Sequence, residues 1–253
     1  MTHDIGIDRS EDVLSITLAR PDRRNALTVA MYSAIAAAIE DAAADQSLRA
    51  IPICGEGQDF TAGNDLHDFL QALPRDCDDI PVWRLLRALA RNPLPLIAAV
   101  HGNAVGIGTT MLLHCELVVA EESARFSLPF VDLGLVPEAA SSLLLPQIAG
   151  RRRAARYLLL GDPFGANEAW DIGLISHIVP DGSARSAMEE IAGRLIAKPR
   201  EALRLTQKLL RQGMSDEVLE RMKAEGDLFS ERLQSAEVAE AITAFFQRKG
   251  GAA

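Results

Sequence analysis

Residues 96–108 carry the sequence LIAAVHGNAVGIG, and they decide which fold to expect. The five apolar residues at the start have the length and composition of a buried strand. The glycines that follow let the backbone turn tightly, and residues 109–114 have the pattern of a helix. A strand that runs through a glycine-rich turn into a helix is one half of a βαβ unit.

The same alternation extends outward from this stretch. Strands are predicted over residues 13–18, 50–54 and 117–120, and helices over residues 29–44 and 80–90. Strands that alternate with helices are typical of a mainly parallel sheet covered by helices. After Pro137 the sequence favours helices over residues 138–148, 151–160, 166–171, 184–197, 201–212, 216–232 and 237–248, with one strand over residues 176–179. We therefore expect an α/β core over residues 1–190, followed by a helical region over residues 191–253.

The composition limits the classes of partner. The chain has 253 residues, 48% of them hydrophobic and 24% charged, which is typical of a globular protein and not of a disordered one. Its 26 Lys and Arg residues against 35 Asp and Glu residues give a net charge of −9. This acidic balance argues against nucleic acid or an anionic membrane as the main partner.

Missing motifs give further expectations. No run of 18 apolar residues is present, and residues 1–9 lack the apolar segment of a signal peptide, so we expect a cytoplasmic location. Cys54, Cys77 and Cys115 lie far apart and form no C-x-x-C pair. We therefore expect reduced thiols, no disulfide framework and no metal site.

Two segments, residues 61–65 (TAGND) and 102–108 (GNAVGIG), each follow a predicted strand and are called the glycine loops below. Small residues let a ligand approach the backbone. Two backbone N–H groups that converge on one point form an oxyanion hole, although glycines after strands also occur in plain tight turns. The spacing does not match G-x-G-x-x-G, so we expect no dinucleotide site.

Four motifs, in this order along the chain, resemble the crotonase (enoyl-CoA hydratase/isomerase) family: residues 20–27, which contain RP and NAL, and residues 60–66 (FTAGNDL), 101–106 (HGNAVG) and 133–137 (LGLVP). The resemblance implies a crotonase-like ββα spiral core with a helical C-terminal trimerisation region. It also implies an acyl-CoA thioester substrate, no cofactor beyond the coenzyme A of that substrate, and a homotrimer or a dimer of trimers.

The resemblance also assigns site residues. The N–H groups of Ala62 and Ile107 would hold the thioester oxygen. The residues that would contact the substrate are Gly63, Asn64, Asp65, Leu66, Gly106, Phe130 and Arg24, the last because the family places basic residues for the coenzyme A phosphates in this turn.

Carboxylates indicate which reaction to expect. The two glutamates of family hydratases fall at Thr110 and Phe130, neither of which can act as a carboxylate acid or base. Glu138, directly after Pro137, matches the base of the peroxisomal-type Δ3,Δ2-enoyl-CoA isomerases, the branch that this chain most resembles. We therefore expect an isomerase that moves a C3=C4 double bond to C2=C3 with a single glutamate.

Two alternatives to the isomerase stay open at this point. Glu138 also suits the start of a helix, where the dipole favours an acid by about 0.3–1 kcal/mol. The protein would then be a catalytically silent acyl-CoA-binding member of the fold, or it would catalyse another acyl-CoA reaction such as hydration or thioester hydrolysis. If Glu138 is the base, apolar neighbours such as Phe130 and Leu135 are expected to exclude water and raise its pKa.

Overall fold

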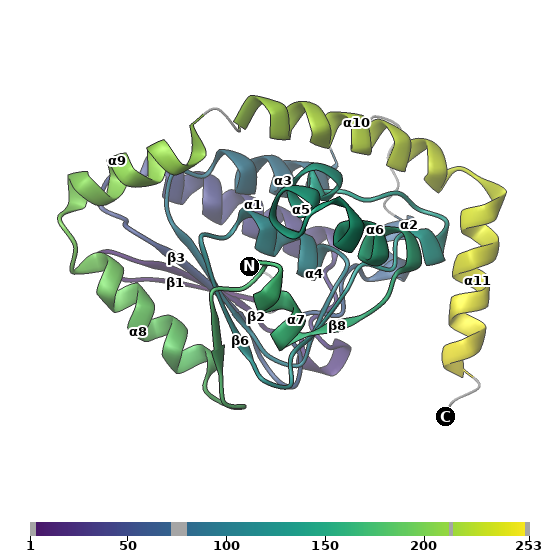
Figure 1. Ribbon diagram of the computed structural model, residues 1–253, viewed down its shortest axis with the longest axis horizontal. Helices are drawn as coiled ribbons and strands as arrows, with labels where there is room; N and C mark the ends of the chain where they lie inside the picture. The colour runs from purple at the N-terminus through teal and green to yellow at the C-terminus, as the bar shows by residue number, and fades with distance from the viewer. Residues whose placement is uncertain (1–3, 72–79, 213–214, 251–253) are drawn as a thin grey trace.

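Figure 1 shows the computed structural model of the protein, which describes residues 4–71, 80–212 and 215–250. Its strands are β1 (Ile5–Arg9), β2 (Leu14–Leu18), β3 (Ile51–Gly55), β4 (Leu96–Val100), β5 (Asn103–Val105), β6 (Leu117–Glu121), β7 (Arg125–Ser127), β8 (Phe164–Gly165) and β9 (His177–Val179). Its α-helices are α1 (Val29–Ala44), α2 (Leu66–Gln71), α3 (Pro81–Arg91), α4 (Ile107–Thr110), α5 (Ser141–Ala149), α6 (Arg151–Leu160), α7 (Ala166–Asp171), α8 (Ala184–Ile196), α9 (Arg200–Arg211), α10 (Ser215–Leu233) and α11 (Ala236–Gly250). Short 3₁₀ helices are η1 (Pro21–Arg23), η3 (Met111–His114) and η4 (Val131–Leu133). Cys77 lies outside the described residues.

Within these ranges the strands form two sheets. The larger sheet has the order β1-β2-β3-β4-β6-β9, in which only β1 and β2 pair antiparallel. The smaller sheet has the order β5-β7-β8. Parallel strands have their carboxyl ends at one edge of a sheet, where α/β proteins place their ligands. The two glycine loops follow β3 and β4 and therefore lie at this edge.

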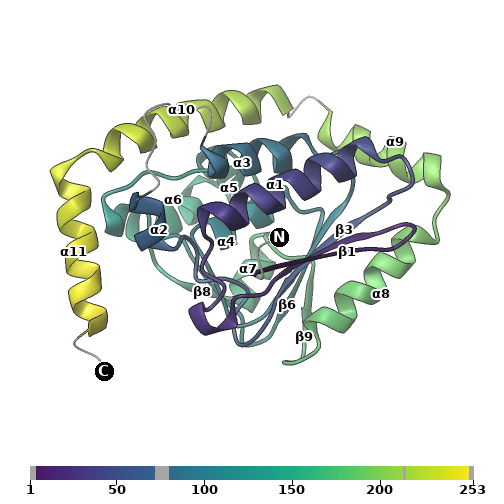
Figure 2. The same ribbon diagram turned by 180° about the vertical axis from the view of Figure 1, so that it is seen from behind.

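Helices cover both faces of the larger sheet. Along β4, Ala98 belongs to the buried cluster that contains α1 and α3, whereas Ile97 and Ala99 belong to the cluster that contains α8. Successive side chains of a strand point to opposite faces, so α8 lies on the face opposite α1 and α3. Figures 1 and 2 show the same arrangement from the front and from behind.

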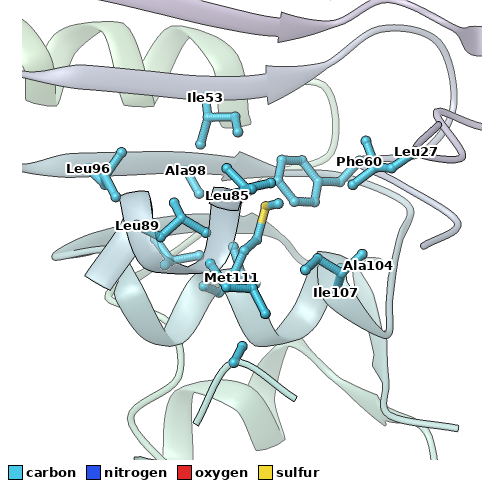
Figure 3. Close-up of a cluster of buried hydrophobic side chains, with 14 of the residues drawn as sticks. Leu27, Ile53, Phe60, Leu85, Leu89, Leu96, Ala98, Ala104, Ile107 and Met111 are labelled. Atoms are coloured by element: carbon cyan, nitrogen blue, oxygen red, sulfur yellow. The ribbon is translucent and has the colours of Figure 1, made fainter. Parts of the chain in front are cut away.

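The glycine loops rest on the larger of these clusters. Figure 3 shows Phe60, which precedes the first glycine loop, lying beside Met111 and Leu85. Ile107, in the second glycine loop, points its side chain into the same cluster and is almost fully buried. The backbone of both loops is therefore held by apolar packing beneath them.

The C-terminal helices do not form a separate body. Position 190, the expected boundary, falls within α8, which packs on the sheet through Met188 and Ile191. Helix α10 crosses α3 (Figure 1), and the Phe229 ring meets the Trp83 ring edge-on at 5.9 Å between centroids. The C-terminal region is thus continuous with the core.

The predicted α/β class and parallel order are confirmed, and two helix predictions are corrected. The helix expected over residues 109–114 is α4 followed by the 3₁₀ helix η3. The helix expected over residues 138–148 starts only at Ser141, because Ala139 and Ala140 adopt left-handed backbone angles. Among the described helices, none combines the length and apolar character needed to cross a membrane.

Candidate active site

The two glycine loops are joined by backbone hydrogen bonds. Thr61 donates its N–H to the Asn103 carbonyl at 3.0 Å, and Val105 donates its N–H to the Thr61 carbonyl at 3.1 Å. The loops also touch beyond this pair, because a Cβ atom added to Gly63 would lie 2.7 Å from the Val105 oxygen. A residue with a side chain at position 63 would therefore separate them.

Two backbone N–H groups are available where the loops meet. Asn64 follows Gly63, whose φ is +84°, and Ile107 follows Gly106, whose φ is +55°. Among the described residues, no acceptor is paired with the N–H of Asn64 or with that of Ile107. Each donor thus follows a glycine with a positive φ angle. This angle turns the chain, so that the next N–H does not take part in the backbone hydrogen bonds between strands.

The predicted donor Ala62 is used by the fold. Its N–H donates to the Arg24 carbonyl at 2.8 Å, so it is not available to a ligand in this structure. Where the loops meet, the structure thus leaves the N–H groups of Asn64, two residues further along, and of Ile107 without an acceptor among the described residues, whereas the N–H of Ala62 is occupied. Sequence reasoning placed Asn64 at the substrate but gave its N–H no role.

A buried tyrosine orders the first of these donors. Tyr32 of α1 is almost fully buried, and its hydroxyl donates a hydrogen bond to Oδ1 of Asn64. Burial raises the pKa of Tyr32 well above its usual value, and the charge of Glu138 raises it further. The hydroxyl therefore keeps its proton and can donate. Sequence reasoning missed Tyr32, because its apolar helical pattern indicates only a core position.

Replacing Tyr32 by Phe is expected to remove this hydrogen bond and lower kcat by about 2- to 10-fold, the equivalent of one hydrogen bond. The matched control is Tyr157→Phe, since Tyr157 is equally buried and its hydroxyl bonds Glu168, outside the glycine loops. Steady-state kinetics of both variants checks the prediction. Equal kcat values for the two variants would contradict it.

Glu138 lies in the turn between η4 and α5 and is only 1% exposed. Thr110 of α4 donates its hydroxyl to Oε1 of Glu138 at 3.3 Å. Because Ile107 is the first residue of the same short helix, α4 links the carboxyl to one of the two free N–H groups.

The surroundings of Glu138 favour its protonated form. Burial raises the pKa of Glu138 from its usual 4.5 to about 8; the Thr110 hydrogen bond opposes the change and the charge of Glu225 adds to it. Phe130 and Leu135 are buried in the same apolar cluster as Ala139, the next residue. The expected rise in the pKa of Glu138 is confirmed, and a carboxyl in this range can both accept and donate a proton near neutral pH.

The raised pKa also predicts how stability depends on pH. Between pH 4.5 and about 8 the unfolded protein has lost the Glu138 proton while the folded protein keeps it, so stability falls as the pH rises. Each pKa unit corresponds to about 1.4 kcal/mol. The variant Glu138→Gln does not titrate and is expected to gain a few kcal/mol relative to the wild type across this window. Urea unfolding of both proteins at several pH values measures the difference, and a difference that does not change with pH would contradict the assignment.

The other predicted substrate contacts occupy structural positions around the loops. Arg24 is half exposed, and its Nε donates to Oδ2 of Asp59 at 2.6 Å. Asp65 accepts a hydrogen bond from Nη1 of Arg20 at 2.8 Å, and Leu66 starts α2. Their contacts hold the first glycine loop, while their role toward a substrate stays a prediction, as does the expected independence from metal.

Comparisons with known proteins agree with this geometry. The family described as enoyl-CoA hydratase/isomerase matches residues 8–251. A crystal structure of enoyl-CoA hydratase/isomerase from Pseudoalteromonas atlantica T6c is 38% identical, with a TM-score of 0.92 and 97% of each chain covered. The 1,2-epoxyphenylacetyl-CoA isomerase of Escherichia coli (strain K12) is 31% identical over 243 residues, 94% of this chain and 93% of that protein. A probable enoyl-CoA hydratase of Rhodobacter capsulatus is 34% identical over 253 residues, 98% of this chain and 96% of that protein.

Proposed function

The chain belongs to the enoyl-CoA hydratase/isomerase family and has the crotonase fold, and on this premise we propose that it is a Δ3,Δ2-enoyl-CoA isomerase. It would convert the C3=C4 double bond of an acyl-CoA into a C2=C3 double bond, and the position of Glu138 leads us to propose that it belongs with the peroxisomal-type branch. The observation that carries the proposal is the buried carboxyl of Glu138, which has a pKa of about 8 and is linked through α4 to the free N–H of Ile107.

The reaction requires one proton to leave C2 and one to reach C4. The ionised Glu138 carboxylate removes the C2 proton, and the electron pair spreads over the dienolate to the thioester oxygen. The N–H groups of Asn64 and Ile107 stabilise that oxygen as it becomes negative. The protonated Glu138 then delivers its proton to C4, so the product forms without any other reactant.

Hydration fits this site less well. It requires water to be activated and a proton to be delivered, which family hydratases do with two glutamates. At the matching positions this chain has Phe130, which is buried and apolar, and Thr110, whose hydroxyl is used in the hydrogen bond to Glu138. One carboxyl is enough for a proton shift between C2 and C4, because these carbons lie in one plane and a carboxyl placed above that plane reaches both.

We also propose that the protein assembles as a homotrimer or a dimer of trimers. Helix α9 leaves Leu205, Leu209 and Leu210 exposed, and α10 leaves Leu228 exposed. Leu205, Leu209 and Leu210 lie within six residues of one helix, and exposed apolar side chains that gather in this way are typical of association surfaces. Analytical ultracentrifugation of the purified protein tests this assembly, and a monomer at micromolar concentration would exclude it.

A paired assay tests the proposed reaction. Purified protein is incubated with a 3-enoyl-CoA and, separately, with a 2-enoyl-CoA. Isomerisation of the first appears as a gain of conjugated enoyl-thioester absorbance, and hydration of the second appears as its loss. Gain with the first substrate and no loss with the second supports the proposal. Loss with the second substrate would indicate a hydratase, and binding of both without turnover would indicate a silent acyl-CoA-binding protein or a different acyl-CoA reaction.

A further inference from the structure

The turn that carries Glu138 has a backbone that its own residues do not stabilise. Ala139 and Ala140 both adopt left-handed angles, with φ of +60° and +55°. This conformation costs an L-residue roughly 1–2 kcal/mol. Ala140 is also the N-cap of α5 and has no side chain that can cap the helix. Contacts from elsewhere must hold this turn in place.

Glu225 of α10 supplies these contacts. Its Oε2 accepts the N–H of Ala140 at 2.6 Å, and its Oε1 accepts the N–H of Ser142 at 2.9 Å. The side chain is 5% exposed. One turn earlier in α10, Arg221 donates to Oγ of Ser142 at 3.1 Å. Glu225 therefore caps α5 from a distant helix and ties the end of the strained turn and the first turn of α5 to α10.

We propose that Glu225 is a positioning residue for Glu138: from α10 it fixes the turn that carries the Glu138 carboxyl. The negative charge of Glu225 also raises the pKa of that carboxyl. The inference rests on the proposed role of Glu138 as the base. It gives the C-terminal region a part in the active site, in addition to any part in assembly.

The charges around the pair agree with this assignment. Both Glu225 oxygens accept N–H groups, which suits the ionised carboxylate, and Arg221 favours the same form. Burial nevertheless raises the pKa of Glu225. Two buried carboxyls of like charge do not ionise together without cost, so the one with more donors ionises first. Among the described residues Glu138 has one side-chain donor, the Thr110 hydroxyl, and is the partner that keeps its proton.

Two other titratable groups face this turn, and neither changes its charge near neutral pH. His114 of η3 hydrogen-bonds through Nε2 to the Ala139 carbonyl at 2.8 Å, and burial lowers its pKa to about 4. Tyr32 of α1 interacts electrostatically with Glu138, and burial raises the pKa of Tyr32 well above its usual value. A change in the Glu138 titration in Glu225 variants is therefore assigned to Glu225 itself.

The test compares Glu225→Gln with Glu220→Gln, a control at an exposed position of the same helix. Infrared difference spectroscopy follows the protonated carboxyl of Glu138, whose band is identified by its loss in Glu138→Gln. We expect Glu225→Gln to move the midpoint of this band to lower pH and to lower kcat on a 3-enoyl-CoA by about 10- to 100-fold, as small displacements of catalytic groups do. The control is expected to change neither quantity.

The outcomes separate this inference from the proposed function. An unchanged infrared midpoint in Glu225→Gln would overturn the inference, even if kcat falls, because a purely structural role lowers kcat without moving the titration. Isomerisation that survives in Glu138→Gln would overturn the proposed function, whatever Glu225 does. If circular dichroism shows that Glu225→Gln does not fold, Glu225→Asp is measured instead, because it keeps the charge on a shorter side chain. A wild-type kcat in Glu225→Asp would overturn the positioning role.

Discussion

Replacing Glu138 by Gln is expected to lower kcat on a 3-enoyl-CoA by about 10³- to 10⁴-fold, at the upper end of what general acid–base catalysis contributes. The loss is large because the same carboxyl removes the C2 proton and returns a proton to C4. Gln has nearly the same shape and still accepts the hydrogen bond from Thr110, but it cannot exchange a proton.

Binding should survive this change. The thioester oxygen is held by backbone N–H groups, which the substitution leaves in place, so the dissociation constant of a saturated acyl-CoA is expected to stay within about threefold of the wild type, as for an interaction made mainly in the transition state. Isothermal titration calorimetry measures this constant and steady-state kinetics measures kcat. A variant that loses binding and turnover together would indicate a disrupted fold instead of a missing base.

Glu121→Gln is the matched control. Glu121 of β6 is also buried, and its Oε1 accepts the N–H of Gly182 at 2.8 Å, in a contact with the start of the α8 region. Its loss removes a buried carboxylate without touching Glu138 or the glycine loops. If Glu121→Gln and Glu138→Gln lower kcat equally, the effect belongs to burial of charge in general and Glu138 is not the base.

Replacing Gly63 by Ala is expected to lower kcat by about 10²- to 10³-fold, the usual result of losing one oxyanion donor. The new Cβ would lie 2.7 Å from the Val105 carbonyl oxygen, and φ of +84° is unfavourable for alanine. The first glycine loop must therefore move away from the second, and the N–H of Asn64 moves with it. Kinetics on a 3-enoyl-CoA measures the loss, and circular dichroism checks that the fold is retained.

Gly173→Ala controls for the backbone conformation alone. Gly173 has φ of +79°, almost the same as Gly63, but no atom lies within 4 Å of its added Cβ. It therefore carries the same cost of a left-handed alanine without the collision. Equal kcat values in Gly63→Ala and Gly173→Ala would show that the first glycine loop supplies no donor to the reaction.

Local pattern was enough to predict most of the sheet. Residues 96–100 were expected as a strand and form β4, and the strand expected over residues 176–179 is β9 at the far edge of the larger sheet. Residues 96–100 are short and entirely apolar, so burial leaves them few alternatives, whereas β9 is half-buried and contains His177. The start of α5 was misplaced because nothing local marks Ala139 and Ala140 as left-handed, a conformation that alanine rarely adopts.

In the candidate site, too, some residues were predicted from the sequence and others required the structure. Glu138 and Ile107 were found by resemblance to a family; the structure shows that Glu138 is buried and that the N–H of Ile107 has no acceptor among the described residues. Choosing between the N–H of Ala62 and that of Asn64 required knowing their hydrogen-bond partners in the structure. The carbonyl of Arg24, 38 residues earlier in the chain, accepts the N–H of Ala62, whereas the N–H of Asn64 has no acceptor among the described residues.

The sequence by itself determined the α/β class, the two glycine loops and the presence of a carboxyl at position 138, because strand periodicity, glycine spacing and residue identity are local properties of the chain. Only the tertiary structure decided which N–H groups are free, why the Glu138 pKa is raised, that Tyr32 contacts Asn64, and that Glu225 contacts the turn that carries Glu138. Glu225 reaches Ala140 across 85 residues. Contacts of this kind depend on how separate elements pack against one another, and desolvation depends on everything that surrounds a group. Neither can therefore be predicted from a short stretch of sequence.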